Sequence, residues 1–410
     1  MTRRLLFVEH HPVFGGPHHR AIVLAGPLRE QGWETVALLP NEPGTALDRY
    51  RTAGVPVTTI ALRRLRRRLR HNAATLAHLA GDVSRIRAAI RREEIDLVVV
   101  AGFESPHGVI AGRLEGLPVV WQIISTRTPM LYRRAMSAFA RRFADVVMTT
   151  GTTVAAAHPG VDRLGERWVP FFSPVDTGRF APSDERRAAA RAELGLPDDC
   201  LVVGTVGNVN PQKGHQTFVR AASRLRRHAP ETRFLILGEQ DANHAAYRQA
   251  LVQEANVSGV RVGEELLIHA PGSRVAELAA AIDVFWFTSV PRSEGVPTAV
   301  MEAMALALPV VATDVGGVRD IVRDRENGFV VPALAPQRLV EATLPLIADA
   351  ERRADVGGAA RAFAVAHCSV EHCIASHLSA FERAVLHCSR RRSARDSTAR
   401  QGPALRRDLK

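Results

Sequence analysis

Short apolar runs alternate with amphipathic helical stretches along the first part of the chain. Between the runs, residues 19–31 and 73–92 space their apolar side chains with the 3.6-residue period of a helix. The runs that we expect to form strands are residues 4–8, 35–39, 57–60, 96–101, 119–124 and 145–150. Strands that alternate with helices in this way predict a parallel, doubly wound sheet.

The pattern breaks near Pro174 and Pro182 and then begins again. The second set of expected strands is residues 201–206, 234–237, 265–268, 284–288, 310–313 and 329–331. We therefore predict an α/β fold of two Rossmann-like domains, residues 1–172 and 173–368, whose carboxyl strand edges face a central cleft. A last amphipathic helix, residues 369–389, is expected to return to the first domain. The Arg/Ser-rich residues 390–410 are expected to be disordered.

Composition fits this organisation, because 410 residues with 46% apolar and 23% charged side chains suit two globular domains. No apolar run approaches the roughly 20 residues that span a bilayer. The short apolar stretch after Arg4 is better read as a strand than as a signal peptide. These observations predict a cytoplasmic protein. Four scattered cysteines make no disulfide framework, and Cys373 and His377, at helical spacing, favour a plain helix over a metal site.

The net charge of +12 is carried almost wholly by arginine, and lysine occurs only at Lys213 and Lys410. A single internal lysine suggests a place where a compact ammonium group is required, although chance retention would give the same pattern. The chain has no zinc motif, recognition helix or aromatic-studded strands, so the charge does not predict nucleic-acid binding.

Two carboxylates, Glu294 and Glu302, follow the apolar run 284–288. Pro297 suits the first turn of a helix, so Glu294 is expected on the strand-to-helix loop and Glu302 inside the helix. Loops of this kind lie at the ligand-binding edge of a parallel sheet. Since carboxylates accept hydrogen bonds from hydroxyl groups, we expect the pair to hold two parts of one hydroxylated ligand.

Glycine loops follow several of the expected strands. The loop from Gly207 to Gly214 carries Lys213 and leads into a helix, which predicts an anion site; an ordinary turn with a solvated lysine is the alternative. Paired glycines also stand at Gly15–Gly16 and Gly316–Gly317. No Gly-x-Gly-x-x-Gly sequence follows the first strand, which disfavours a dinucleotide-dependent dehydrogenase.

Residues 289–328 resemble the signature of glycosyltransferase family 4, whose members have the GT-B fold. The resemblance rests on Glu294-Gly295, Glu302-Ala-Met-Ala305, Pro309-Val-Val-Ala-Thr313, Gly316-Gly317, Asp320-Ile-Val322 and Asn327-Gly-Phe-Val330. The loop from Gly207 to Gly214 resembles the family's phosphate loop, and Gly15–Gly16 resembles its N-terminal glycine loop.

This resemblance implies a retaining transfer from a nucleotide-diphosphate sugar to a glycan, lipid or small-molecule acceptor. It places Glu294 near the donor sugar, as nucleophile or positioning group, Glu302 on the ribose and Lys213 on the departing diphosphate. The remaining donor contacts that it implies are Gly15, Gly16, Asn208, Gly295, Val296, Pro297 and Thr298. There is no Asp-x-Asp sequence, so we expect no metal and no other cofactor.

Two positions depart from the family pattern. Asn208 stands where the family usually has arginine, and Ile124 stands where many members have a histidine beside the reacting centre. No catalytic residue of the first domain can therefore be assigned, and His107 is the candidate among the histidines expected at loops, which also include His10, His11, His18 and His19. A nucleotide-sugar epimerase of the same fold and a catalytically impaired nucleotide-sugar- or glycan-binding protein remain alternatives.

The segment Arg63–Arg70 contains six arginines. Members of the family that glycosylate lipids often place a basic amphipathic face in this region on an anionic membrane. The segment therefore predicts either peripheral contact with the inner membrane face or a solvated helix surface.

Overall fold

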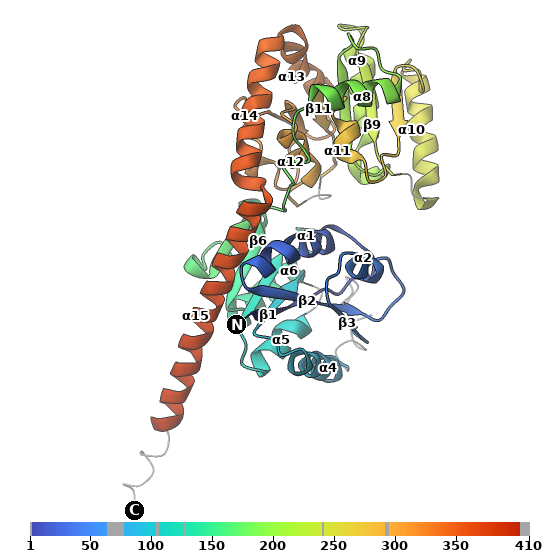
Figure 1. Cartoon of the computed structure of the whole chain (residues 1–410). Coiled ribbons are helices and arrows are strands. Elements are labelled where there is room, and N and C mark those ends of the chain that lie inside the picture. The colour runs from blue at the N-terminus through green and yellow to red at the C-terminus, as the bar shows by residue number, and fades with distance from the viewer. Residues whose placement is uncertain are drawn as a thin grey trace, which may run out of the picture. The chain divides into compact units, whose positions relative to one another are not determined.

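The computed structural model describes residues 2–63, 78–103, 106–126, 128–239, 242–291 and 295–401. The chain divides into two compact units (Figure 1). Unit 1 comprises Met1–Phe171 together with Cys373–Lys410, and unit 2 comprises Phe172–His372.

Unit 1 is built on a parallel sheet in the order β3-β2-β1-β4-β5-β6-β7. Its strands are β1 (Arg3–Val8), β2 (Trp33–Pro40), β3 (Val57–Ile60), β4 (Leu97–Ala101), β5 (Val119–Ile123), β6 (Val146–Thr150) and β7 (Trp168–Phe171). The six strands predicted from apolar runs are all present. The edge strand β7 was missed because it contains Pro170, which cannot donate a ladder hydrogen bond and is tolerated only at an edge.

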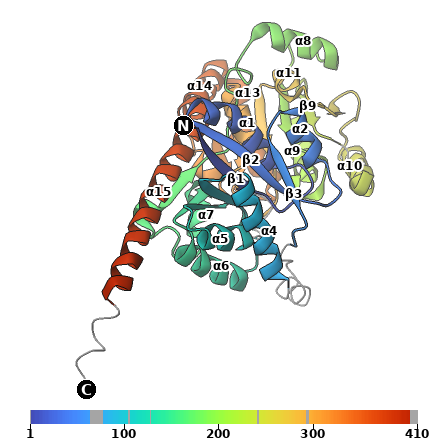
Figure 2. The ribbon, with the colours of Figure 1, turned by 60° about the horizontal axis from the view of Figure 1, so that its bottom comes forward.

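Helices cover both faces of this sheet. They are α1 (Gly16–Glu30), α2 (Ala46–Thr52), α4 (Leu79–Arg92), α5 (Pro106–Leu114), α6 (Met130–Phe143) and α7 (Gly151–Ala156). Figure 2 shows α4, α5 and α6 gathered on one face. Ile86 of α4, Val109 of α5 and Met136 of α6 pack there against a core that includes Val98 and Val100. Helix α1 covers the opposite face.

Unit 2 repeats the architecture with a parallel sheet in the order β10-β9-β8-β11-β12-β13. Its strands are β8 (Val202–Val206), β9 (Arg233–Leu237), β10 (Leu266–His269), β11 (Val284–Phe287), β12 (Val310–Thr313) and β13 (Phe329–Val331). Its helices include α8 (Asp184–Leu194), α9 (His215–Leu225), α10 (Ala245–Val257), α11 (Val275–Ala279), α12 (Thr298–Ala305), α13 (Pro336–Ala348) and α14 (Ala350–Cys368). One apolar core lies on each face of the sheet.

The last helix, α15 (Val370–Gln401), corrects the prediction of disorder from residue 390 onward, because it continues to Gln401. Tertiary contacts hold this part in place: Arg391 donates to Leu117 O and to Asp145, and Arg392 donates to Gly116 O. Residues 402–410 lie outside the described part. Within the described ranges, no helix combines the length and the apolar character needed to cross a membrane.

Candidate functional site

The loop after β8 carries Lys213 at the carboxyl edge of the unit 2 sheet. Gly214 has φ of +65°, and a Cβ there would lie 2.0 Å from the carbonyl oxygen of Thr288, so only glycine fits. Two hydrogen bonds fasten this loop to the one after β11: Thr288 Oγ1 donates to Lys213 O at 2.9 Å, and Val290 N donates to Gln212 O at 3.0 Å. These contacts fix the position of the Lys213 backbone, from which its side chain extends.

The half-buried Lys213 side chain runs beneath Gly207. A Cβ at Gly207 would lie 3.2 Å from Lys213 Cδ, and one at Gly238 would lie 2.1 Å from Gly207 O. The loops after β9 and β11 thus pack closely against the backbone of the β8 loop that carries Lys213. Asn208, the departure from the family pattern, is exposed at the same edge.

The loop before α12 joins this arrangement through the glycine pair after β12. Gly317 N donates to Gly295 O at 2.7 Å, and a Cβ at Gly317 would lie 2.6 Å from Val296 Cγ2. Pro297 precedes the helix as its N-cap, with ψ of 116°, rather than standing in its first turn as predicted. Glu294 belongs to residues 292–294, which lie outside the described part.

Glu302 lies in the second turn of α12 and is half-buried. Burial raises the pKa of its carboxyl group to about 7, and the positive charge of Arg179 partly opposes that rise. A carboxyl group with this pKa changes charge near neutral pH, and a hydroxylated ligand that donates hydrogen bonds to it favours the ionised form.

The predicted donor-site residues of unit 2 that are described occupy one sheet edge: Asn208, Lys213, Gly295, Val296, Pro297, Thr298 and Glu302. Gly15 and Gly16 belong to unit 1, at the start of α1. Their individual contacts with a ligand stay predictions. Among the residues that the structure describes, no group of three His, Cys, Asp or Glu side chains could hold a metal ion.

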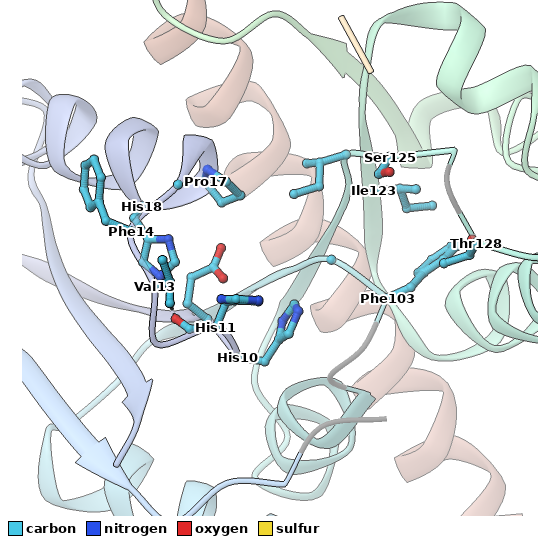
Figure 3. A pocket seen from close by; sticks show the side chains of 14 residues that line it. His10, His11, Val13, Phe14, Pro17, His18, Phe103, Ile123, Ser125 and Thr128 are labelled. Carbon is cyan, nitrogen blue, oxygen red and sulfur yellow. Dashed lines mark hydrogen bonds between the residues drawn. The ribbon is translucent and has the colours of Figure 1, made fainter. Parts of the chain in front are cut away.

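Unit 1 contains a cavity of about 360 Å³ at the carboxyl ends of β1, β4 and β5. Figure 3 shows His10, His11 and His18 beside it, with Phe14 and Phe103. Ile124 lines the cavity as well, just after β5, and so does Glu9, just after β1. Glu9 was not among the predicted site residues; the signal that could have identified it is its position as the first polar residue after an apolar strand.

His107 does not line this cavity. It is fully buried in α5, with Nε2 3.9 Å from Asp82 Oδ2 of α4, and burial lowers its pKa. Its side chain is directed toward the helix layer, which corrects the choice of His107 as the first domain's candidate. His18 lines the cavity, and its Nε2 lies 2.9 Å from His11 O. Burial lowers the pKa of His18 to about 4.

A buried polar chain links α1, β5 and α15. Arg20 donates to Gln122 Oε1, and Gln122 Nε2 lies 3.0 Å from His377 Nε2. His377 Nδ1 lies 2.7 Å from Cys373 O and must donate to it, so Nε2 accepts from Gln122. Burial lowers the pKa of His377 to about 3, so this histidine is neutral. The Cys373–His377 pair is therefore part of the unit 1 interior.

The fold is that of the GT-B class. The Anabaena protein HepE, solved in complex with UDP, superposes with a TM-score of 0.78 at 21% identity and covers 92% of this chain and 99% of its own. The GT-B fold predicted from the sequence is confirmed.

Sequence comparison identifies the kind of domain within that fold. Residues 200–349 match the family model Glycosyl transferases group 1. The D-inositol 3-phosphate glycosyltransferase of Stackebrandtia nassauensis is 34% identical over 190 residues, 45% of this chain and 42% of that one. The GDP-mannose-dependent alpha-(1-6)-phosphatidylinositol monomannoside mannosyltransferase of Mycolicibacterium smegmatis is 33% identical over 196 residues, 47% and 50% of the two chains. The predicted resemblance to glycosyltransferases is confirmed, and the chain spans about half the length of these curated relatives or less.

Proposed function

We propose that this protein transfers a glycosyl group from a nucleotide-diphosphate sugar to an acceptor hydroxyl, with retention at the anomeric carbon. The observation that carries the proposal is the glycine loop with Lys213 at the carboxyl edge of unit 2, which the loops after β9 and β11 hold by close backbone contacts. This loop lies inside the region that matches Glycosyl transferases group 1. The named activities of the relatives support it, as do the UDP and UDP-glucose complexes of HepE.

In this reaction the bond between the anomeric carbon and the diphosphate breaks, and its electron pair leaves with the diphosphate. The Lys213 ammonium group stabilises the negative charge that develops there. A new bond forms between the anomeric carbon and the acceptor oxygen, whose proton passes to an oxygen of the departing diphosphate. Attack on the face that the diphosphate leaves preserves the anomeric configuration.

The two carboxylates bind different parts of the donor. Ionised Glu302 accepts hydrogen bonds from the ribose hydroxyls, and Glu294 positions the donor sugar through its hydroxyls. The cavity of unit 1 takes the acceptor, because it lies at the ligand-binding edge of its sheet while the donor contacts belong mainly to unit 2.

No metal or other cofactor enters this scheme, in which lysine and backbone N–H groups bind the diphosphate. We place the reaction in the cytoplasm. Peripheral contact with an anionic membrane through Arg63–Arg70 is part of the proposal; residues 64–77 lie outside the described part of the chain.

The stereochemistry of the product tests the retaining step. Proton NMR of the glycosylated product, followed from the first turnover, should show the anomeric configuration of the donor. A product with the opposite configuration would contradict retention and would require a base in unit 1 that deprotonates the acceptor.

A further inference from the structure

The outward side of helix α6 is made only of apolar and arginine side chains. Tyr132, Met136 and Phe139 of this helix pack into the core of unit 1. Because successive residues are about 100° apart around a helix, the exposed residues share the other side. The α6 face that they form, which lies wholly within the described ranges, contains neither a carboxylate nor an uncharged polar side chain. Its residues are Met130, Leu131, Arg134, Ala135, Ala138, Arg141 and Arg142.

The α6 face carries positive charge that the carboxylates of the described residues do not neutralise. Among those residues, no carboxylate forms an ion pair with its three arginines. Asp145, the first carboxylate after the helix, is fully buried and pairs with Arg113 and Arg391 instead. Residues 161–167 contact the end of α6 through Arg167, which donates to the backbone of that helix, but they carry as many basic as acidic side chains.

Helix α4 provides the contrast, because it lies on the same side of the sheet and is also rich in arginine (Figure 2). Its exposed Arg91 donates to Glu115 at 2.8 Å, and Arg92 donates to Glu93 at 3.1 Å. Paired charges of this kind are typical of a helix face in contact with water. The α6 face has no such pairs within the described part of the chain, so it suits a partner that supplies the anions.

Two apolar side chains form the N-terminal end of the α6 face. Met130 is 53% exposed and Leu131 is 74% exposed. Thr128, just before the helix, lines the unit 1 cavity (Figure 3), and the Tyr132 hydroxyl donates to Phe103 O of the cavity wall at 2.9 Å. A surface that covers Leu131 therefore lies next to the cavity in which the proposed function places the acceptor.

An anionic lipid bilayer complements both properties of the α6 face. Apolar side chains gain by leaving water at the boundary between head groups and acyl chains, and arginines bind lipid phosphates there. A nucleic acid would satisfy the arginines but would leave Leu131 in water. We propose that the α6 face lies on an anionic bilayer, with Leu131 in the head-group boundary and the three arginines on lipid phosphates. The proposal concerns a described helix rather than Arg63–Arg70, and only the closeness to the acceptor rests on the proposed function.

Sedimentation of the full-length protein with vesicles tests the proposal. Wild type should bind vesicles that contain phosphatidylglycerol and should not bind vesicles of phosphatidylcholine alone. Each arginine near an anionic leaflet strengthens binding about fivefold, so Arg134→Gln, Arg141→Gln and Arg142→Gln combined should weaken it about 100-fold. The matched control lowers the net charge equally and should weaken binding only slightly. It neutralises three exposed arginines of unit 2, Arg227, Arg248 and Arg352.

Absence of wild-type binding to the anionic vesicles overturns the inference. So does equal weakening in the two triple variants, which would reduce the contact to net charge. Undiminished binding of the α6 variant overturns it as well, whether or not neutralising Arg63–Arg70 then abolishes binding. Release of nucleoside diphosphate with a soluble acceptor requires no vesicles, so its failure would count against the proposed function and leave this inference standing.

A fluorescent label locates the contact on α6. The native cysteines are buried, so a polarity-sensitive maleimide dye should react with the new thiol of Leu131→Cys. Val257→Cys on α10 is the control, because Val257 is 83% exposed. Anionic vesicles should shift the emission of the label at position 131 to shorter wavelength and leave the label at position 257 unchanged. No shift at position 131, or an equal shift at both positions, overturns the inference.

Discussion

Lys213 is the residue on which the proposed chemistry depends most. Removing one group that stabilises developing negative charge typically lowers turnover by about 100- to 1000-fold. We predict a loss of this size in kcat for Lys213→Ala, with a smaller change in KM for the donor. Steady-state kinetics would measure both, with the exposed Arg227→Ala as the control for charge alone. Equal kcat values in Lys213→Ala and wild type would remove Lys213 from the reaction.

Glu302 makes a prediction about pH. Its pKa in the folded protein, about 7, lies above the ordinary value of 4.5, so the folded state holds this proton more tightly than the unfolded chain does. The resulting stabilisation is fully present below the ordinary pKa and is lost as the pH rises through about 7. Between pH 5 and 8, the melting temperature of wild type should therefore fall relative to that of Glu302→Gln.

Nucleotide binding should show the opposite trend, because the ribose hydroxyls donate to the ionised carboxylate. We expect UDP or GDP to bind several-fold more tightly at pH 8 than at pH 6 in wild type. Glu302→Gln should show a smaller change, because only the ionisation of the nucleotide's terminal phosphate remains. Parallel pH profiles for the two proteins in calorimetry would contradict the placement of ribose on Glu302.

At the scale of elements, Gly214 joins the loops after β8 and β11. Gly214→Ala brings a Cβ within 2.0 Å of Thr288 O, whereas Gly195, with a similar φ of +64°, has no atom within 4 Å of its added Cβ. Gly195→Ala therefore measures the strain of the left-handed backbone alone, roughly 1–2 kcal/mol. We predict a clearly larger loss of stability and of nucleotide binding for Gly214→Ala; equal losses in urea unfolding would show that the close approach does not matter.

The packing of helix α15 against unit 1 includes hydrogen bonds to the buried Asp145. This carboxylate accepts from Val119 N at 3.0 Å, from Arg391 Nη2 at 3.2 Å and from His387 Nδ1 at 2.9 Å. Breaking a buried charge network costs about 3–5 kcal/mol. Urea unfolding of Asp145→Asn should show a loss of that order, and the exposed Asp162→Asn should show almost none. A comparable, small loss in both would mean that α15 is held by apolar packing alone.

Burial and tertiary contacts explain which elements could be predicted from the sequence. The central strands are continuous apolar runs because both faces of the sheets are buried, so their positions could be found without the structure. The helix beyond Arg390 could not, because its order depends on partners at Gly116, Leu117 and Asp145, distant in the sequence. The sequence singles out Lys213 and Glu302 through their motifs, and their roles stay predictions. The place of Glu9 in the cavity wall could not be predicted, because the cavity forms only where the ends of β1, β4 and β5 lie side by side.

At the scale of the whole molecule, each unit presents polar loops at the carboxyl edge of its own sheet. Unit 2 gathers a lysine, glycine loops and a titrating carboxyl group, and unit 1 holds a cavity with acceptor groups and apolar walls. In the proposed function, unit 2 binds the nucleotide sugar and unit 1 binds the acceptor, so transfer requires both units.

Release of nucleoside diphosphate from a panel of UDP-, GDP- and ADP-sugars, with lipid and soluble acceptors, tests this central claim most directly. The account predicts that wild type turns over at least one donor and that Lys213→Ala and Glu294→Ala each reduce this turnover about 100-fold or more. Failure of wild type to release nucleotide from any donor, or undiminished release by both variants, would contradict it.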